Sequence, residues 1–201
     1  MTALPKRLLT PAEYLAREET AAFKSEFYCG ETFAMAGASL AHIDISGNLF
    51  LAIGNQLAGG KCRISGSDLR VLVSATGLYT YPDLTIVCGP REVDPLSPQT
   101  VTNPTAIIEV LSPSTASYDQ GEKLRHYQQI PSLREYVLVA QDRPWVVRLV
   151  RQESNWLLTG FDGLDAEFAL TTVPVRIPLS VIYRDIEFPP PTLKPRTSPE
   201  P

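Results

Sequence analysis

Two acidic residues of this sequence lie beside or within runs that are otherwise apolar, and residues of that kind can do chemistry. Asp83 precedes the run Leu84–Val87, and Glu109 lies within the run Ala106–Leu111. An ionised carboxylate in an apolar core is costly unless a cation compensates it, so one shared metal ion would serve both residues. Carboxylate oxygens favour Mg²⁺ or Mn²⁺. Such an ion activates water and stabilises charge on phosphate, so the pair predicts hydrolysis of a phosphodiester bond.

The proline before Asp83 supports this interpretation. Pro82 has no backbone N–H, so it disturbs strand pairing where the side chain of Asp83 can leave the sheet and face a cleft. A Pro-Asp pair taken alone is more typical of a turn at the start of a strand. The apolar surroundings of Glu109 favour the metal site over that alternative.

A lysine lies on a predicted helix just beyond Glu109. Asp119, Lys123 and Tyr127 are spaced by four residues, which places them on one helical face. The ammonium group of Lys123 could support the attacking water or offset charge on a phosphate oxygen. The alternative is an exposed Asp119–Lys123 pair worth about 0.3 to 0.5 kcal/mol.

These motifs together resemble one known family. Tyr81-Pro82-Asp83 is followed by Ile-Glu-Val-Leu-Ser-Pro-Ser-Thr at residues 108–115, and then by Asp119 and Lys123. The pattern resembles the Uma-two (Uma2) family of restriction endonucleases, in the PD-(D/E)xK nuclease superfamily, over roughly residues 14–186. The resemblance implies a four-stranded mixed sheet flanked by helices.

The resemblance also implies roles for particular residues. Asp83 and Glu109 would be metal ligands, with the backbone carbonyl of Val110 as a third candidate ligand. The superfamily pattern places a lysine two residues after the glutamate, but this chain has Leu111 there. The resemblance transfers that role to Lys123 on the helix. Glu26 also matches a position typical of the family and would assist catalysis. Asp68 and Arg70 match two further family positions, to which we give less weight.

The hydrophobic periodicity predicts the elements that position these residues. The predicted helices are Thr10 to about Glu19, capped by Thr10; Ser39 to about Ala58; and Tyr118–Gln129. The predicted strands are Phe23–Tyr28 and Glu31–Met35 as a hairpin around Cys29-Gly30, Cys62–Val73 broken at Gly66, Leu78–Cys88, Ala106–Leu111, Glu135–Ala140, and a second hairpin of Trp145–Arg151 and Trp156–Phe161. This order predicts a mixed α/β (α+β) sheet with an N-terminal helix and a hairpin, and central, doubly covered strands from Cys62 to Leu111. The resemblance implies that this sheet is restriction-endonuclease-like.

Composition predicts one domain over residues 1–188 and a Pro-rich disordered tail over residues 189–201. With 44% hydrophobic residues and no signal peptide or membrane span, we expect a soluble, cytoplasmic protein. Three separated cysteines argue against a disulfide framework and favour a reducing compartment. The net charge of −4 counts modestly against bulk attraction to nucleic acid, although a bound metal would reverse the field at the cleft.

Other residues with chemical potential have simpler interpretations. We expect His42 and His126 to be structural or surface residues, although His42 could point into the cleft. Trp145 and Trp156 are more typical of a hairpin core than of base stacking. The arginines Arg143, Arg148 and Arg151 alternate with apolar residues, which favours a solvated face over phosphate contacts.

Three functions remain open. The first is a Mg²⁺-dependent DNA endonuclease, which would act as a homodimer because cutting both strands usually requires two active sites. The second is a binding module that retains the nuclease fold and recognises nucleic acid or protein without cutting. The third is a hydrolase of small phosphoesters, which would cleave model phosphodiesters but not DNA.

Overall fold

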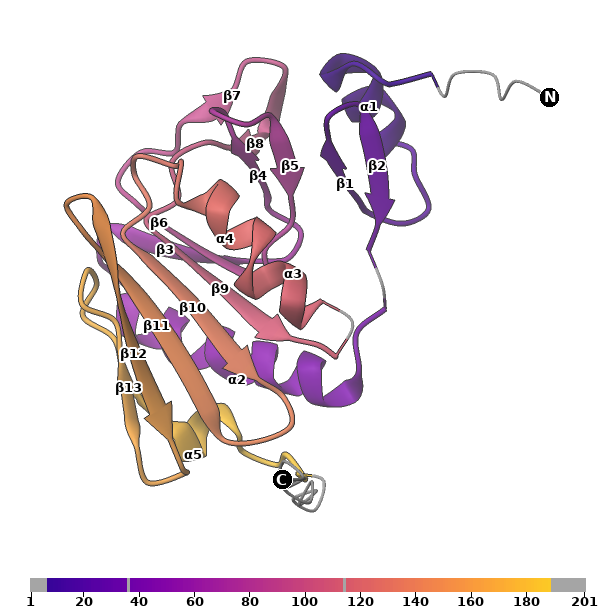
Figure 1. Cartoon of the computed structure of the whole chain (residues 1–201). Coiled ribbons are helices and arrows are strands. Elements are labelled where there is room, and N and C mark those ends of the chain that lie inside the picture. The colour runs from indigo at the N-terminus through magenta and orange to yellow at the C-terminus, as the bar shows by residue number, and fades with distance from the viewer. Residues whose placement is uncertain (1–6, 36, 114, 189–201) are drawn as a thin grey trace, which may run out of the picture.

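Two six-stranded sheets and the helices around them make up the chain in the computed structural model, which describes residues 7–35, 37–113 and 115–188 (Figure 1). The main sheet has the strand order β12-β11-β10-β9-β6-β3. Its strands are β3 (Cys62–Gly66), β6 (Leu84–Cys88), β9 (Ala106–Leu111), β10 (Glu135–Ala140), β11 (Trp145–Gln152) and β12 (Asn155–Asp162). This is the expected mixed sheet, but it has six strands where the resemblance implied four.

The centre of the main sheet is β9 beside β10. Both strands are buried along their whole length, and they pair in parallel while the other neighbours pair antiparallel. Parallel neighbours need a crossover, and the helices between them provide it. At the edge of this sheet β3 is only partly buried, so the expectation that it would be central and doubly covered is wrong.

The second sheet has the order β2-β1-β5-β4-β8-β7. Its strands are β1 (Ser25–Tyr28), β2 (Glu31–Ala34), β4 (Arg70–Val73), β5 (Leu78–Thr80), β7 (Val93–Asp94) and β8 (Ser97–Val101). The β1–β2 hairpin turns at Cys29 and Gly30, both with positive φ, as the sequence predicts. The break predicted at Gly66 is confirmed, because the chain leaves β3 there and enters the second sheet as β4.

A single strand over Leu78–Cys88 does not form. The chain runs as β5 in the second sheet, leaves it at Tyr81-Pro82-Asp83, and continues as β6 in the main sheet. Pro82 cannot donate to a strand ladder, which explains why the two strands separate at this point. Asp83 therefore lies where the chain passes from one sheet to the other.

Helices α1 (Pro11–Glu18) and α2 (Leu40–Leu57) form where the sequence predicts them. Thr10 and Glu13 make the expected capping box on α1, and Ser39 caps α2. One face of α2 packs on the main sheet through Ile45, Leu49, Ile53 and Leu57. Three elements that the sequence did not predict complete this layer: β13 (Glu167–Ala169), β14 (Arg176–Pro178) and α5 (Leu179–Ile182).

The opposite face of the main sheet is covered by α3 (Ala116–Gln120) and α4 (Glu122–Tyr127). These replace the single helix predicted over Tyr118–Gln129. The helix is interrupted at Gly121, where φ is −114° and ψ is −89°, values outside the α-helical region. The crossover from β9 to β10 is retained, but it consists of two short helices.

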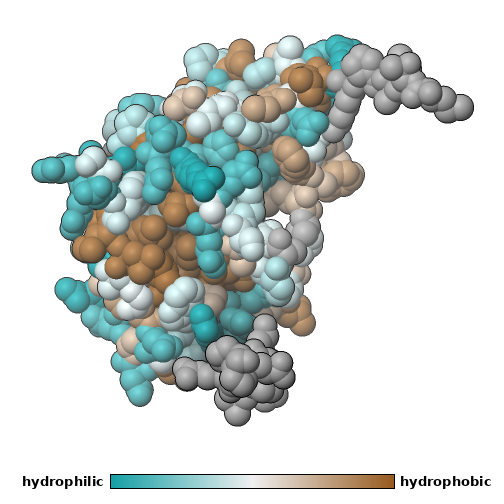
Figure 2. Space-filling view, in the orientation of Figure 1, coloured by the Kyte–Doolittle hydropathy of each residue, from teal (hydrophilic) through white to brown (hydrophobic). Residues whose placement is uncertain are grey.

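The β11–β12 hairpin is also where the sequence predicts it. Figure 2 shows a hydrophobic area over β10–β12 with hydrophilic residues around it. Trp145 and Trp156 are partly buried against the adjacent apolar cluster, which confirms the hairpin-core interpretation. The solvated-face interpretation is wrong for two arginines, because Arg148 donates to the carbonyl of Ala169 and Arg151 to three carbonyls before β10.

Two cysteines correct the expectation drawn from cysteine spacing. Antiparallel pairing of β3 with β6 places Cys62 directly opposite Cys88, and the two are joined by a disulfide bond. The residues are 26 positions apart, so only the strand register reveals the pair. Within the described ranges, no helix is both long enough and apolar enough to cross a membrane. The predicted disordered tail, residues 189–201, lies outside the described residues.

Candidate active site

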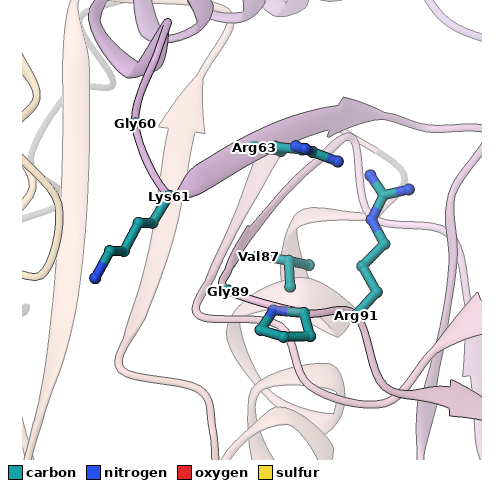
Figure 3. A pocket seen from close by; sticks show the side chains of 7 residues that line it. Gly60, Lys61, Arg63, Val87, Gly89 and Arg91 are labelled. Carbon is teal, nitrogen blue, oxygen red and sulfur yellow. The ribbon is translucent and has the colours of Figure 1, made fainter.

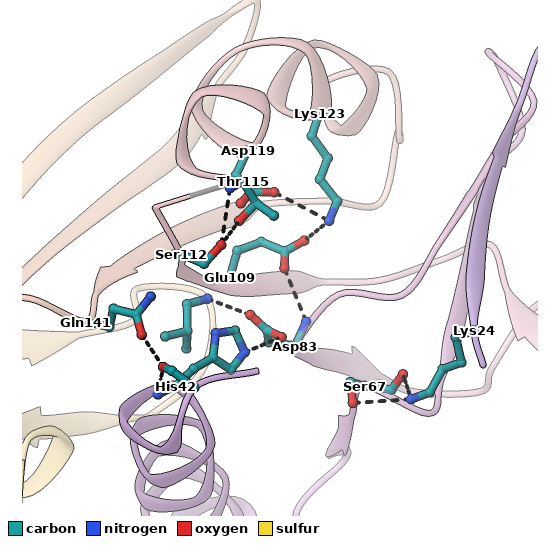
Figure 4. Close-up of polar contacts among 12 residues, drawn as sticks. Lys24, His42, Ser67, Asp83, Glu109, Ser112, Thr115, Asp119, Lys123 and Gln141 are labelled. Carbon is teal, nitrogen blue, oxygen red and sulfur yellow. Dashed lines mark hydrogen bonds and ion pairs between the residues drawn. The ribbon is translucent and has the colours of Figure 1, made fainter. Parts of the chain in front are cut away.

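The pairing of β6 with β9 brings Asp83 and Glu109 together. Leu84 is opposite Ile108, so Asp83, one residue earlier, lies beside Glu109. Each carboxylate accepts a hydrogen bond from the other residue's strand: the N–H of Val110 donates to Asp83 Oδ2 at 2.7 Å, and the N–H of Asp83 donates to Glu109 Oε2 at 3.3 Å (Figure 4). The two acidic side chains that the sequence singles out therefore converge.

Lys123 reaches this pair from α4. Its Nζ lies 2.9 Å from Glu109 Oε1, 3.1 Å from Glu26 Oε1 and 3.5 Å from Asp119 Oδ1. The lysine side chain is 6% exposed, so the exposed-pair alternative is wrong. Tyr127, one turn further along α4, donates its hydroxyl to Glu109 Oε1 at 2.9 Å. The predicted common face of these helical residues therefore survives the interruption at Gly121.

Glu26 joins the site from the second sheet. It lies on β1, and Thr80 of the neighbouring β5 donates its hydroxyl to Glu26 Oε1. Because β5 leads directly into Tyr81-Pro82-Asp83, the same chain segment positions Glu26 and Asp83. The second sheet thus supplies an acidic residue to a site that is built mainly on the first.

Burial dominates the electrostatics of the cluster. Desolvation raises the pKa of Glu109 to about 8, helped by the charges of Asp83 and Asp119 and opposed by Lys123. Burial likewise raises the pKa of Asp119. Desolvation alone would lower the pKa of Lys123, but the carboxylates of Glu109, Glu26 and Asp119 outweigh it and raise that pKa well above its ordinary value. The lysine is therefore a permanent cation in an acidic cluster.

For His42 the preferred interpretation as a structural or surface residue is wrong, and the alternative that it points into the site is the one that the structure shows. His42 lies in the first turn of α2, where Ser39 caps its backbone N–H, and its Nε2 is 2.9 Å from Asp83 Oδ1. The long helix thus begins at the site and directs an imidazole at one of its carboxylates (Figure 4). Its place just after the helix cap was visible in the sequence, but the direction of the helix was not. His126, by contrast, is structural: it bonds Thr76 and packs on Tyr28.

Two family positions lie apart from this cluster. The side chain of Asp68 is 98% exposed and pairs with Lys24. Arg70 is buried, and it donates to Thr100, Tyr81 and Ser97. Neither residue has a contact with Asp83 or Glu109 among the interactions of the described residues, so the structure does not bring these two family positions into the acidic cluster.

The loop after β9 supports the start of α3. The hydroxyls of Ser112 and Thr115 lie 2.9 Å apart, and the N–H of Thr115 donates to Ser112 Oγ. Thr115 also contacts the carboxylate of Asp119 by a side-chain hydrogen bond. The Ser-Pro-Ser-Thr motif therefore positions Asp119; its third residue, Ser114, lies outside the described residues.

The donor set fits a hard divalent cation. The carboxylates of Glu109, Asp119 and Glu26 contact one ammonium group, and Asp83 lies beside Glu109, which leaves an excess of negative charge if all four are ionised. Among the described residues no group of three or more His, Cys, Asp or Glu side chains is arranged to hold a metal ion. Two carboxylates and a backbone carbonyl would suffice for Mg²⁺, which usually keeps several waters and binds through one or two carboxylates.

The members of the cluster differ in how far their side chains are exposed. The side chains of Asp83 and His42 are 15% and 16% exposed, whereas those of Glu109 and Lys123 are 5% and 6% exposed. A substrate or a hydrated cation would therefore reach Asp83 first. Lys123 and Glu109 lie behind it, against the second sheet and the crossover helices.

Comparison with known proteins places the chain in a family. Residues 11–181 match the family described as "Uma2: Putative restriction endonuclease". Two uncharacterized proteins of Synechocystis sp. (strain PCC 6803), slr1290 and sll1609, are 37% and 35% identical to it; the alignments cover 90% and 87% of this chain and 94% and 99% of theirs.

A solved structure shows the same fold. It is a crystal structure from Anabaena variabilis, described as a putative nuclease belonging to DUF820, with a TM-score of 0.69 and 18% identity. The match covers 85% of this chain and 94% of the other. The restriction-endonuclease-like architecture predicted from the motifs is therefore confirmed. With its family match over most of the chain, this protein belongs to the Uma2 family.

Proposed function

We propose that this protein is a metal-dependent endonuclease that hydrolyses phosphodiester bonds in DNA. The observation that carries the proposal is the convergence of Asp83 and Glu109 from neighbouring strands, beside the ammonium group of Lys123. Family membership supports a nuclease-like activity, and the geometry supports the chemistry. We also propose that it acts in the cytoplasm.

Each residue has a defined part in this proposal. Asp83, Glu109 and the carbonyl of Val110 would hold Mg²⁺ or Mn²⁺, which would supply Lewis acidity and an activated water. The N–H of Val110 and the imidazole of His42 orient the Asp83 carboxylate. Lys123 stays protonated, so it stabilises negative charge instead of removing a proton. Glu26 holds the lysine in place.

A plasmid-nicking assay tests the proposal. Purified protein with Mg²⁺ or Mn²⁺ should convert supercoiled DNA to open circles, and Asp83→Asn should reduce the rate by at least about a hundredfold because it removes a ligand charge without changing shape. Asp68→Asn is the matched control: it also removes one carboxylate, but at an exposed position outside the cluster. Equal nicking by wild type and Asp83→Asn would refute the proposed site.

Metal titration separates the nuclease from the binding module. Calorimetry should detect Mn²⁺ binding to the wild type and weaker binding to Asp83→Asn. DNA binding without any divalent-ion binding would favour the non-catalytic module. Two sequence features are consistent with that alternative: the acidic pI of about 5.3, and Leu111 at the position where the superfamily has a lysine. Hydrolysis of model phosphodiesters without cleavage of DNA would favour the small-phosphoester hydrolase.

Cleavage of both strands would require a second active site. We propose that a second copy of the chain provides it, in a homodimer with two-fold symmetry. The exposed apolar face of α2, which includes Ile43, Phe50 and Leu51, is the surface on which this contact would form.

A further inference from the structure

A second charged feature lies at the edge strand β3. A pocket of about 420 Å³ lies between the turn that follows α2 and the turn that follows β6 (Figure 3). Three cationic residues line it: Lys61, Arg63 and Arg91. The proposed active site uses none of them.

Glycines keep this pocket open. Gly89 has a φ of +82° and donates its N–H to the carbonyl of Lys61 at 2.9 Å, which ties the two turns together. A Cβ built on Gly89 would meet no atom within 4 Å, so the space beside this backbone is empty. The pocket is therefore formed where this backbone hydrogen bond joins the two turns, and three charged side chains line it.

The guanidinium groups of Arg63 and Arg91 converge on one side of the pocket, whereas Lys61 points away from them (Figure 3). Arg91 is held in this position by a 2.8 Å hydrogen bond to Ser65 Oγ. Across the described parts of the chain, no carboxylate forms an ion pair with any of the three cations. Two like charges that face each other without a counter-ion favour an anion between them.

The chemistry of this anion follows from the two guanidinium groups. Each is a planar fork of donors that matches the oxygens of a phosphate, and such pairs are often bidentate. The chain has a net charge of −4, so bulk charge does not attract phosphate to it. The two arginines, which have no acidic partner, therefore concentrate positive charge locally on a chain whose net charge is negative.

The pocket and the candidate active site lie along the same pair of strands, β3 and β6, which pair antiparallel. Arg63 is opposite Val87, four residues along β6 from Asp83. At about 3.3 Å per residue along a strand, Val87 and Asp83 are roughly 13 Å apart.

We propose that Arg63 and Arg91 form a phosphate-binding site for the backbone of the nucleic-acid substrate. At about 3.4 Å of helix axis per charge on one strand, the bound phosphate lies about four nucleotides from the phosphodiester that is cut. Lys61 adds positive charge at the other rim. This inference rests on the proposed endonuclease function, because it places the substrate relative to Asp83.

Fluorescence anisotropy with a labelled DNA duplex tests the site. The full-length protein is measured in a chelating buffer, where no metal-dependent cleavage occurs, over a series of salt concentrations. The double variant Arg63→Gln/Arg91→Gln should bind roughly tenfold more weakly, and its plot of log affinity against log salt should be shallower by about 0.9, because the two guanidinium groups bind one phosphate.

The matched control is Arg176→Gln/Arg184→Gln. It removes the same charge from β14 and the segment after α5, elements on the α2 side of the main sheet. This control should keep the wild-type slope. An unchanged slope in Arg63→Gln/Arg91→Gln, an equal change in the control, or a wild type that does not bind the duplex would overturn the proposal.

A second measurement distinguishes DNA from free phosphate. If inorganic phosphate raises the melting temperature of the wild type but not of the double variant, while the DNA slopes are equal, the pocket binds free phosphate and the DNA proposal fails. The two proposals can also fail separately. Metal-dependent nicking with equal slopes rejects this site alone, whereas a changed slope without nicking rejects the nuclease alone.

Discussion

At the scale of single residues, Lys123 is the most constrained member of the site. A buried ammonium among three carboxylates is stabilising only while all partners remain, since loss of one partner leaves buried charge uncompensated. We expect Lys123→Met to lower the free energy of unfolding by about 3 to 5 kcal/mol, measured by urea denaturation.

A second variant makes this prediction specific. Lys123→Met/Glu26→Gln should recover part of the lost stability, because it removes one of the carboxylates that the lysine compensates. A Lys123→Met protein as stable as the wild type would mean that the four side chains are not a charged cluster in solution.

His42 provides a separate residue-scale prediction. It contacts a carboxylate that would bind the metal, and residues that orient ligands in this way typically contribute 10- to 100-fold to metal affinity. His42→Ala should therefore weaken Mn²⁺ binding by about 10- to 100-fold, measured by calorimetry. His126→Gln is the control, since that histidine bonds Thr76 outside the cluster; an equal loss in both variants would contradict the role of His42.

At the scale of elements, Gly121 is the residue that the crossover requires. A Cβ there would lie 2.9 Å from the carbonyl oxygen of Ser117, closer than real side chains approach. Gly121→Ala should lower the free energy of unfolding by about 1 to 3 kcal/mol, because the clash must be relieved by moving α3 against α4. Differential scanning calorimetry measures the change.

The matched control is another glycine in a regular helix. Gly54 lies within α2, and a Cβ there would meet Ile64 at an ordinary 3.6 Å. Gly54→Ala should raise the free energy of unfolding by about 0.5 to 1 kcal/mol, as expected for alanine in a helix interior. Destabilisation by both variants, to a similar extent, would argue against a special geometry at Gly121.

The sequence predicted the elements well where periodicity and capping agreed, and less well where tertiary contacts decide. The Thr10 capping box located α1, and the helical spacing of apolar residues located α2, to within a residue or two. In α2, however, apolar side chains recur on more than one face: Ile45 is buried whereas Ile43 is 53% exposed. Which face meets the sheet depends on the packing of the layer, and local sequence does not specify it.

At the scale of the whole molecule, the exposed face of α2 predicts self-association. Leu40, Ile43, Phe50 and Leu51 lie at helical spacing and are 79%, 53%, 43% and 54% exposed. Exposed apolar patches on otherwise polar surfaces mark interaction sites, and a stripe along one helix can pair with its own symmetry copy.

Analytical ultracentrifugation tests this contact. The wild type should sediment as a dimer, and Phe50→Glu should shift it to a monomer because a charge would be buried at the interface. Leu157→Glu introduces the same charge at an exposed leucine of β12 and should leave the dimer intact. A wild-type monomer, or equal dissociation by both variants, would contradict a dimer through α2.

The amino-acid sequence by itself determined which residues are the candidates for the proposed chemistry. Burying a carboxylate in an apolar run costs free energy, so the sequence alone indicates that Asp83 and Glu109 are unusual. The four-residue spacing of Asp119, Lys123 and Tyr127 predicts that these three share one helical face. Only the tertiary structure decided what surrounds them. The contact between His42 and Asp83 and the pairing of Cys62 with Cys88 both join segments far apart in the chain. Such contacts depend on strand register and on the direction of a helix, which are properties of the packed layers and leave no local pattern in the sequence.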